Sequence, residues 1–95
     1  MADFQKLHDE GNDALTAKDY EKALSCFQKA LESNPEFTIA LHSMGVTYQK
    51  LEQFDKALEC FDKRLAIDKF DTGLLNQKGI TLRKMNRYDD AMKVY

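Results

Sequence analysis

The sequence predicts an all-α fold in which antiparallel helix-turn-helix hairpins stack side by side. Three observations lead to this prediction. The 95-residue chain contains one proline and four glycines, which leaves little room for a turn-rich β fold. Its apolar residues recur with helical spacing. The same pattern also returns every 34 residues, which indicates one structural unit used repeatedly.

Six columns of residues keep the 34-residue interval. They are Leu7, Leu41 and Leu75; Gly11, Gly45 and Gly79; Tyr20, Phe54 and Tyr88; Ala23, Ala57 and Ala91; Leu24, Leu58 and Met92; and Phe27, Phe61 and Tyr95. We therefore interpret residues 1–95 as a single domain with repeat 1 at 4–37, repeat 2 at 38–71 and a partial repeat 3 at 72–95.

Each repeat is expected to form two helices. The second helix of repeat 1 places apolar residues at i, i+1, i+4, i+7 and i+8, which is one helical face. These residues are Ala23, Leu24, Phe27, Ala30 and Leu31. The first helix of repeat 2 keeps a similar spacing at Leu41, Met44, Tyr48 and Leu51. The expected helices are, in chain order, 4–17, 20–33, 37–51, 54–67, 71–85 and 88–95.

Polar breaks separate these helices. They fall at Lys18-Asp19, Glu52-Gln53 and Asn86-Arg87. Between the repeats, Asn34 and Pro35 predict a helix start, because Asn is a favourable N-cap and Pro suits the first helical position.

The glycine column predicts close packing. A glycine inside a helix costs about 1 kcal/mol relative to alanine. Three such glycines are most simply explained if another helix approaches too closely for a Cβ atom. The alanine column suits the same crossing from the second helix, and the large aromatic side chains are expected to fill the space between hairpins.

This pattern resembles the tetratricopeptide repeat (TPR), and the resemblance covers residues 4–95. The matching residues are Leu7, Gly11, Ala14, Ala23, Phe27, Ala30 and Pro35 in repeat 1; Leu41, Gly45, Tyr48, Ala57 and Phe61 in repeat 2; and Leu75, Gly79, Leu82, Ala91 and Tyr95 in repeat 3. Ala14, Arg64 and Lys69 depart from the usual Tyr, Ala and Pro. Arg64 either extends out of the packed seam or makes a specific polar contact.

The resemblance implies a right-handed superhelix whose concave groove binds another protein or a short peptide. The core columns leave a set of residues on the first helices facing this groove: Gln5, His8, Asn12, Leu15, Ile39, His42, Val46, Gln49, Asn76, Ile80 and Arg83. Aliphatic residues mixed with amides and imidazoles predict a ligand with apolar anchors and little net charge.

Some members of the resembled family hold the acidic tail of heat-shock chaperones in a dicarboxylate clamp. The corresponding positions here are His8, Asn12, Ser43, Gly73 and Gln77. Only Asn12 matches, and the three expected cations are absent. Because charge-assisted bonds are the strong contacts to a carboxylate, we do not expect this clamp to operate.

Composition and motifs argue against other functions. A net charge of −2 argues against nucleic-acid binding, and no apolar run reaches the roughly 18 residues of a membrane span. The absence of a recognisable secretory signal predicts a cytoplasmic protein in which Cys26 and Cys60 are free thiols. His8 and His42 lack the further ligands of a zinc site. We expect no cofactor, no metal and no enzymatic activity.

Two functions remain after these exclusions: an interaction module with a scaffold, adaptor or assembly role, and a structural, self-associating segment of a longer solenoid. The second is suggested by the expected helix 88–95, for which we see no cap. Its residues Ala91, Met92 and Tyr95 would form an apolar stripe that could support a homo-oligomer.

Overall fold

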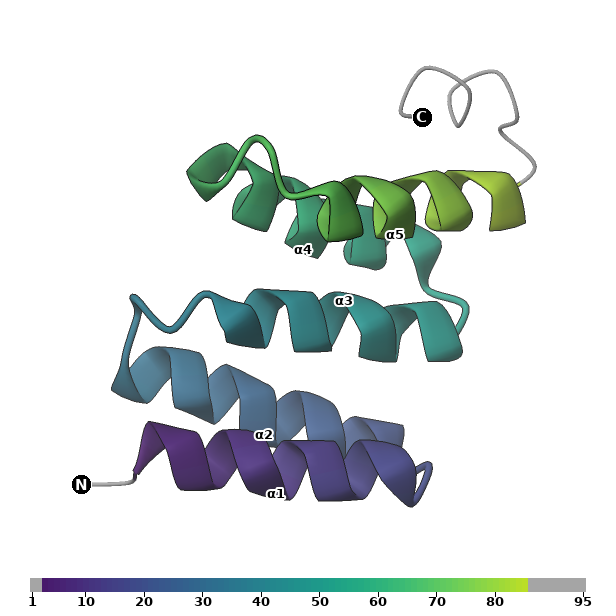
Figure 1. The fold of residues 1–95 in the computed structure, drawn as a ribbon. Coiled ribbons are helices and arrows are strands. Elements are labelled where there is room, and N and C mark those ends of the chain that lie inside the picture. The colour runs from purple at the N-terminus through teal and green to yellow at the C-terminus, as the bar shows by residue number, and fades with distance from the viewer. Residues whose placement is uncertain (1–2, 86–95) are drawn as a thin grey trace.

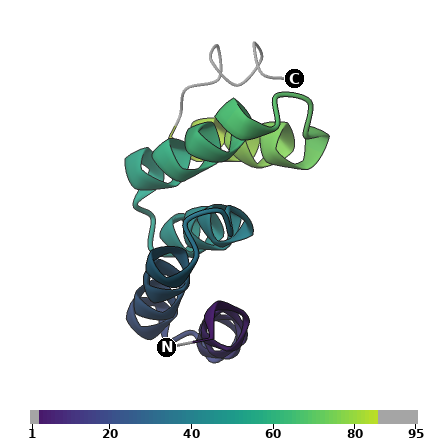
Figure 2. The ribbon, with the colours of Figure 1, turned by 90° about the vertical axis from the view of Figure 1, so that its left-hand side faces the viewer.

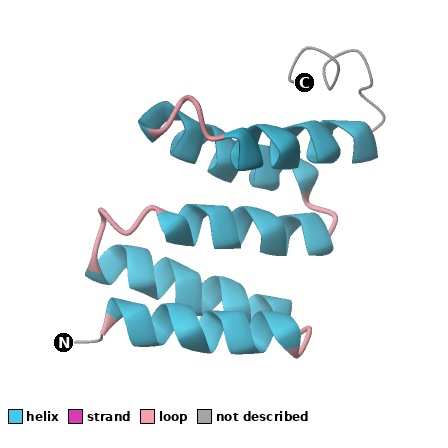
Figure 3. Cartoon of the chain, in the orientation of Figure 1, coloured by secondary structure: helices cyan, strands magenta, loops and turns pink. Residues whose placement is uncertain are grey.

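The computed structural model describes residues 3–85, and all regular structure in this range is helical (Figure 3). The helices are α1 (Phe4–Thr16), α2 (Tyr20–Ser33), α3 (Ile39–Lys50), α4 (Phe54–Ile67) and α5 (Thr72–Lys84). The all-α class is thus confirmed, and five expected helices are found to within two residues at each end. The sixth, expected at 88–95, lies outside the described residues.

The helices stack in chain order. Figure 1 shows the α1–α2 hairpin at the N-terminal end of the stack, α3 in the middle, and α4 with α5 at the other end. Each helix packs on the next one in the chain. In addition α1 approaches α3 and α3 approaches α5, whereas the backbones of α2 and α4 stay farther apart. The stack therefore curves with α1, α3 and α5 on its inner face (Figure 2).

The core is organised around two phenylalanines that are completely buried, Phe27 and Phe61. A Cβ atom on Gly11 would lie 2.5 Å from Cε1 of Phe27, and one on Gly45 would lie still closer to Phe61. The predicted close approach at these glycines is therefore confirmed. The atoms that fill the Cβ position belong to the aromatic ring of the second helix, and not to the alanine column as expected. In repeats 1 and 2 the glycine and the aromatic residue of one hairpin therefore form a single contact.

Each ring also reaches the following hairpin. Phe27 clusters with Ala14, Ala23 and, on α3, Ala40. Phe61 clusters with Ala57 and, on α5, Leu74. We call the place where α1, α2 and α3 meet the first junction, and the place where α3, α4 and α5 meet the second junction.

The polar breaks within the hairpins are tight turns in which one residue adopts a left-handed conformation. Lys18 has φ 65°. Its N–H donates to the carbonyl of Leu15 at 3.0 Å, and the N–H of Asp19 donates to the carbonyl of Ala14 at 2.8 Å. This is the Schellman arrangement that satisfies the last carbonyls of a helix. Glu52, with φ 61°, closes α3 in the same way.

Replacing Lys18 or Glu52 with glycine is expected to stabilise the fold by about 0.5–1 kcal/mol each. A non-glycine residue in the left-handed region costs roughly 1–2 kcal/mol, part of which the greater backbone entropy of glycine offsets. Urea unfolding measures the change. Lys29→Gly, on the exposed side of α2, is the control and should destabilise by about 1 kcal/mol. Destabilisation in all three variants would contradict this account.

The expected helix start at Asn34 and Pro35 is wrong. Asn34 is the C-cap of α2, and α3 begins at Ile39. The Oδ1 atom of Asn34 accepts a bond from the N–H of Glu36 at 3.1 Å, and its carbonyl accepts from the N–H of Phe37 at 2.9 Å. The side chain of Asn34 therefore closes a turn between the repeats instead of capping α3.

Candidate functional site

The structure places the predicted binding residues on α1, α3 and α5 with different degrees of exposure. Gln5, Asn12, Ile39, Asn76 and Arg83 are exposed; His8, Leu15, His42, Val46 and Ile80 are half-buried; and Gln49 is buried. Leu15 packs partly against the cluster around Phe27, and Val46 against the cluster around Phe61. The exposed members are therefore the better candidates for contact with a ligand.

The side chain of Gln49 is buried between α3 and α5. Its Nε2 donates to Oγ1 of Thr81 at 2.5 Å and to the carbonyl of Gln77 at 3.3 Å. Thr81 is completely buried. The amide of Gln49 thus joins α3 to α5, and binding a ligand through it would first require breaking these bonds. Gln49 is therefore a weaker binding candidate than the exposed residues of the same helices.

A chain of hydrogen bonds joins the side chains of Asn12, His8 and Ser43. Nε2 of His8 lies 2.9 Å from Oγ of Ser43, and Nδ2 of Asn12 lies 3.4 Å from Nδ1 of His8. If Nδ1 accepts from the amide of Asn12, Nε2 carries the proton and donates to Ser43. Burial lowers the pKa of the His8 imidazole, and the neighbouring Asp9 carboxylate opposes this shift. His8 is therefore mainly neutral at pH 7 and supplies no full positive charge there.

The first junction is closed by aromatic side chains. The ring of Phe37 packs 4.8 Å from that of Phe4 and 5.1 Å from that of His8, measured between centroids. Ala30, near the end of α2, is completely buried. Aromatic rings thus fill the inner end of the first junction.

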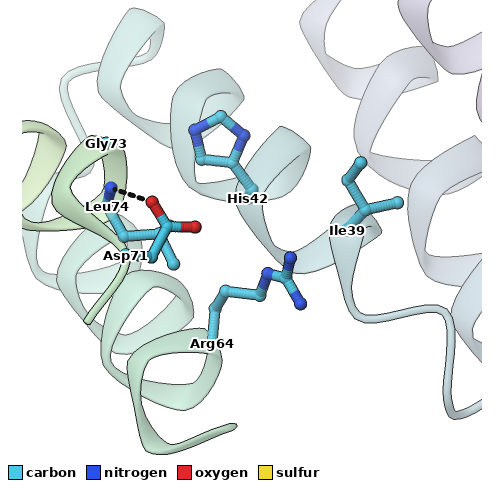
Figure 4. A pocket seen from close by; sticks show the side chains of 6 residues that line it. All are labelled: Ile39, His42, Arg64, Asp71, Gly73 and Leu74. Atoms are coloured by element: carbon cyan, nitrogen blue, oxygen red, sulfur yellow. Dashed lines mark hydrogen bonds between the residues drawn. The ribbon is translucent and has the colours of Figure 1, made fainter. Parts of the chain in front are cut away.

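The second junction has polar residues at the equivalent positions. In the 34-residue register, Thr38 replaces Phe4, Asp71 replaces Phe37, Arg64 replaces Ala30 and Gly73 replaces Ile39, while His42 corresponds to His8. The result is a pocket between α3, α4 and α5. Its lining residues are Ile39, His42, Arg64, Asp71, Gly73 and Leu74 (Figure 4).

Two charged side chains occupy opposite sides of this pocket. Nη1 of Arg64 donates to Oγ1 of Thr38 at 2.6 Å, so the specific polar contact is the interpretation of Arg64 that the structure supports. Oδ1 of Asp71, the N-cap of α5, accepts from the N–H of Leu74 at 3.1 Å. Figure 4 shows the Asp71 carboxylate turned toward the space below His42 and the Arg64 guanidinium extending toward Ile39.

The imidazole of His42 responds to both charges. Burial lowers its pKa most, Asp71 raises it and Arg64 lowers it. We therefore expect its pKa to rise in Arg64→Ala and to fall in Asp71→Asn. An NMR titration of the imidazole protons measures both shifts, with His8 as the internal reference. Shifts in the same direction in the two variants would contradict this arrangement.

Sequence reasoning singled out Arg64 without assigning it a role, and it did not consider Asp71. The signal was present in the repeat register, because a charge replaces an apolar residue at two columns of the same junction. Only the folded structure places these two columns around one pocket.

Both cysteines lie in the part of the chain that the structure describes. Cys26 and Cys60 are buried free thiols, and burial raises the pKa of Cys60 to about 11, so its thiol stays protonated. Among residues 3–85, no group of three or more metal-ligating side chains is assembled. None of the described helices has the length and apolar character needed to cross a bilayer.

Known proteins share this architecture. Over residues 14–77, more than half of its length, the chain matches the tetratricopeptide repeat family. The Sgt2 TPR domain from Aspergillus fumigatus is 27% identical, with a TM-score of 0.90, over 100% of this chain and 63% of that one. The first TPR of Spaghetti (RPAP3), bound to HSP90 peptide SRMEEVD, is 20% identical, with a TM-score of 0.89. That match covers 97% of this chain and 73% of the Spaghetti chain.

The MamA protein is 20% identical, with a TM-score of 0.90, and the match covers 96% of this chain. The chain spans half the length of that MamA chain. These likenesses agree with the repeat register, the glycine–aromatic contacts and the stacked hairpins. The chain belongs to the tetratricopeptide repeat family.

Proposed function

We propose that this chain is a protein-interaction module that binds a peptide or partner segment along its inner face, in a scaffold, adaptor or assembly role. The observation that carries the proposal is the exposure of Ile39. This aliphatic residue is 45% exposed on the inner face and lines the pocket. The exposed amides of Gln5, Asn12 and Asn76 lie on the helices of the same face. Such a mixture of apolar and polar groups suits an extended peptide.

The preferred ligand has apolar anchors and little net charge. Two clamp positions of the family, Gly73 and Gln77, carry no cation in this chain, and His8 is mainly neutral at pH 7. A carboxylate bound there would lack charge-assisted bonds. Although Spaghetti was solved with an HSP90 peptide, we therefore propose a different ligand class for this chain. We propose a binding role without catalysis or cofactor, in the cytoplasm.

Matched substitutions test the proposal. Ile39→Glu places a charge on the inner face, and Ile67→Glu makes the same change at a residue of α4 that is 62% exposed. A peptide array with the unmodified protein identifies ligands, and fluorescence polarisation then measures their affinity. Ile39→Glu should weaken binding at least tenfold, whereas Ile67→Glu should not. Equal affinities in both variants, or tightest binding to acidic C-terminal peptides, would refute the proposal.

Self-association is a second candidate function. Phe70, in the turn between α4 and α5, is 88% exposed, and Ile67 lies near it in sequence with 62% exposure. Exposed apolar residues of this size are candidates for a contact between copies. The residues of the expected C-terminal stripe lie outside the described range. Light scattering over a concentration series tests the idea: Phe70→Glu should reduce association, and a monomer at high concentration would exclude it.

A further inference from the structure

The pocket at the second junction is not a requirement of packing. The equivalent space at the first junction is occupied by Phe37, which packs on Phe4 and His8. The family fold is therefore compatible with a closed junction. In the second junction, Asp71 and Gly73 take the places of a phenylalanine and an isoleucine, and the space stays open.

Gly73 differs from the glycines of the core. A Cβ atom on Gly73 would approach only Oδ1 of Asp71, at 3.2 Å, whereas Gly11 and Gly45 are covered by aromatic rings. No neighbouring helix forces a glycine at this position. The consequence of the missing side chain is that the first turn of α5 forms an open wall of the pocket.

The two charges in the pocket retain bonding capacity. A guanidinium has five N–H donors, and a carboxylate has about four acceptor sites. Arg64 uses one donor on Thr38, and Asp71 uses one oxygen on the N–H of Leu74. Within residues 3–85, no ion pair joins Arg64 to Asp71. The pocket therefore offers a donor group and an acceptor group that do not neutralise each other by direct contact.

We propose that this pocket binds a planar amide group of the ligand peptide. The amide oxygen accepts from the guanidinium of Arg64, the amide N–H donates to the carboxylate of Asp71, and an adjoining aliphatic group rests on Ile39. This inference deepens the proposed function and rests on it. It assigns Arg64 and Asp71 as residues that determine specificity, in addition to the exposed residues predicted from the sequence.

Charge selects this chemistry over the alternatives. A carboxylate would be attracted by Arg64 but repelled by Asp71. An ammonium group would be attracted by Asp71 but repelled by Arg64. The two formal charges sum to zero, and His42 adds little because burial lowers its pKa. A neutral group that accepts on one edge and donates on the other satisfies both side chains and leaves no charge uncompensated.

The amide can come from the peptide main chain or from an Asn or Gln side chain. Three tripeptides, acetylated and amidated at their ends, distinguish these sources: Leu-Ala-Leu, Leu-Asn-Leu and Leu-Asp-Leu. They are titrated into the ¹⁵N-labelled protein, and the signals of Gly73 N–H and Arg64 Nε–H are followed. Equal affinity for the Ala and Asn peptides assigns the main chain. At least fivefold tighter binding of the Asn peptide assigns the side chain.

Two variants test the roles of the charges. Arg64→Ala restores the residue type found at the equivalent position 30, so its fold should be preserved. It should lower the affinity for the Leu-Ala-Leu and Leu-Asn-Leu peptides at least fivefold. Asp71→Asn keeps an N-cap for α5 but removes the negative charge. It should lower the affinity for the Leu-Ala-Leu and Leu-Asn-Leu peptides and raise the affinity for Leu-Asp-Leu relative to them.

Several results would overturn the inference: tightest binding of the Asp peptide to the unmodified protein, no signal change at Gly73 and Arg64 with any tripeptide, or unaltered affinity in both variants. These failures are distinguishable from failure of the proposed function. An array ligand that binds the unmodified protein and is weakened by Ile39→Glu supports the inner-face module even if the amide pocket is wrong. If no peptide on the array binds the unmodified protein, the proposed peptide-binding function is itself rejected.

Discussion

Replacing Phe61 with alanine is expected to lower the free energy of unfolding by about 3–5 kcal/mol. The side chain is completely buried, packs against Ala57 on α4 and Leu74 on α5, and covers Gly45. Its removal leaves a cavity where three helices meet, so neighbouring residues of two hairpins lose contacts together. Because small domains have total stabilities of about 5–15 kcal/mol, this loss is a large fraction of the whole.

Phe70→Ala is the matched control for this prediction. It removes the same ring from a residue that is 88% exposed, and its effect should stay within about 0.5 kcal/mol. Urea unfolding followed by circular dichroism measures both variants. Comparable losses in the two would show that burial at the second junction does not determine the stability of this chain.

Gly45→Ala is expected to destabilise the protein by about 1–3 kcal/mol, although alanine is the better helix former by about 1 kcal/mol. The new Cβ atom would overlap the buried ring of Phe61, which has little space to move. In the Phe61→Ala background the overlap disappears. There the same substitution should be neutral or stabilise by up to about 1 kcal/mol, because only the helix propensity remains.

A double-mutant cycle at positions 45 and 61 measures this coupling, which should be at least about 1 kcal/mol. If Phe61→Ala is unfolded without denaturant, Phe61→Leu takes its place in the cycle. Gly45→Ala combined with Phe27→Ala is the control, because Phe27 covers Gly11 and not Gly45. The control pair should be additive. Additivity at 45 and 61 would reject the view that the ring makes glycine necessary.

The sequence was sufficient to predict the five described helices and the close approach at Gly11 and Gly45, because these depend on spacing along the chain. It did not predict that the approaching atoms belong to the aromatic rings, since it assigned that crossing to the alanine column. The ring of Phe27 meets Gly11 through a separation that recurs in Phe61 and Gly45. One helix boundary was predicted incorrectly because Asn34 can bond either to a helix N-terminus or within a turn. Spacing alone does not decide between these two uses of the same side chain.

The candidate site was less predictable because it depends on neighbouring helices. Periodicity places Gln49 away from the core of its own hairpin, but it does not reveal that Thr81 of α5 covers that face. The bond between Arg64 and Thr38 likewise joins the last turn of α4 to the residue before α3. A helical period describes the faces of one helix, whereas a pocket depends on the distances and angles between helices.

The contact of each helix with only its near neighbours in the chain has a consequence for folding. No described helix must wait for a distant segment before it can pack, since the most separated contacts join α1 to α3 and α3 to α5. The entropy lost in closing loops is therefore small, and such topologies fold in microseconds to milliseconds. One hairpin can also open while the other stays packed, because the energy that couples them is confined to the first junction.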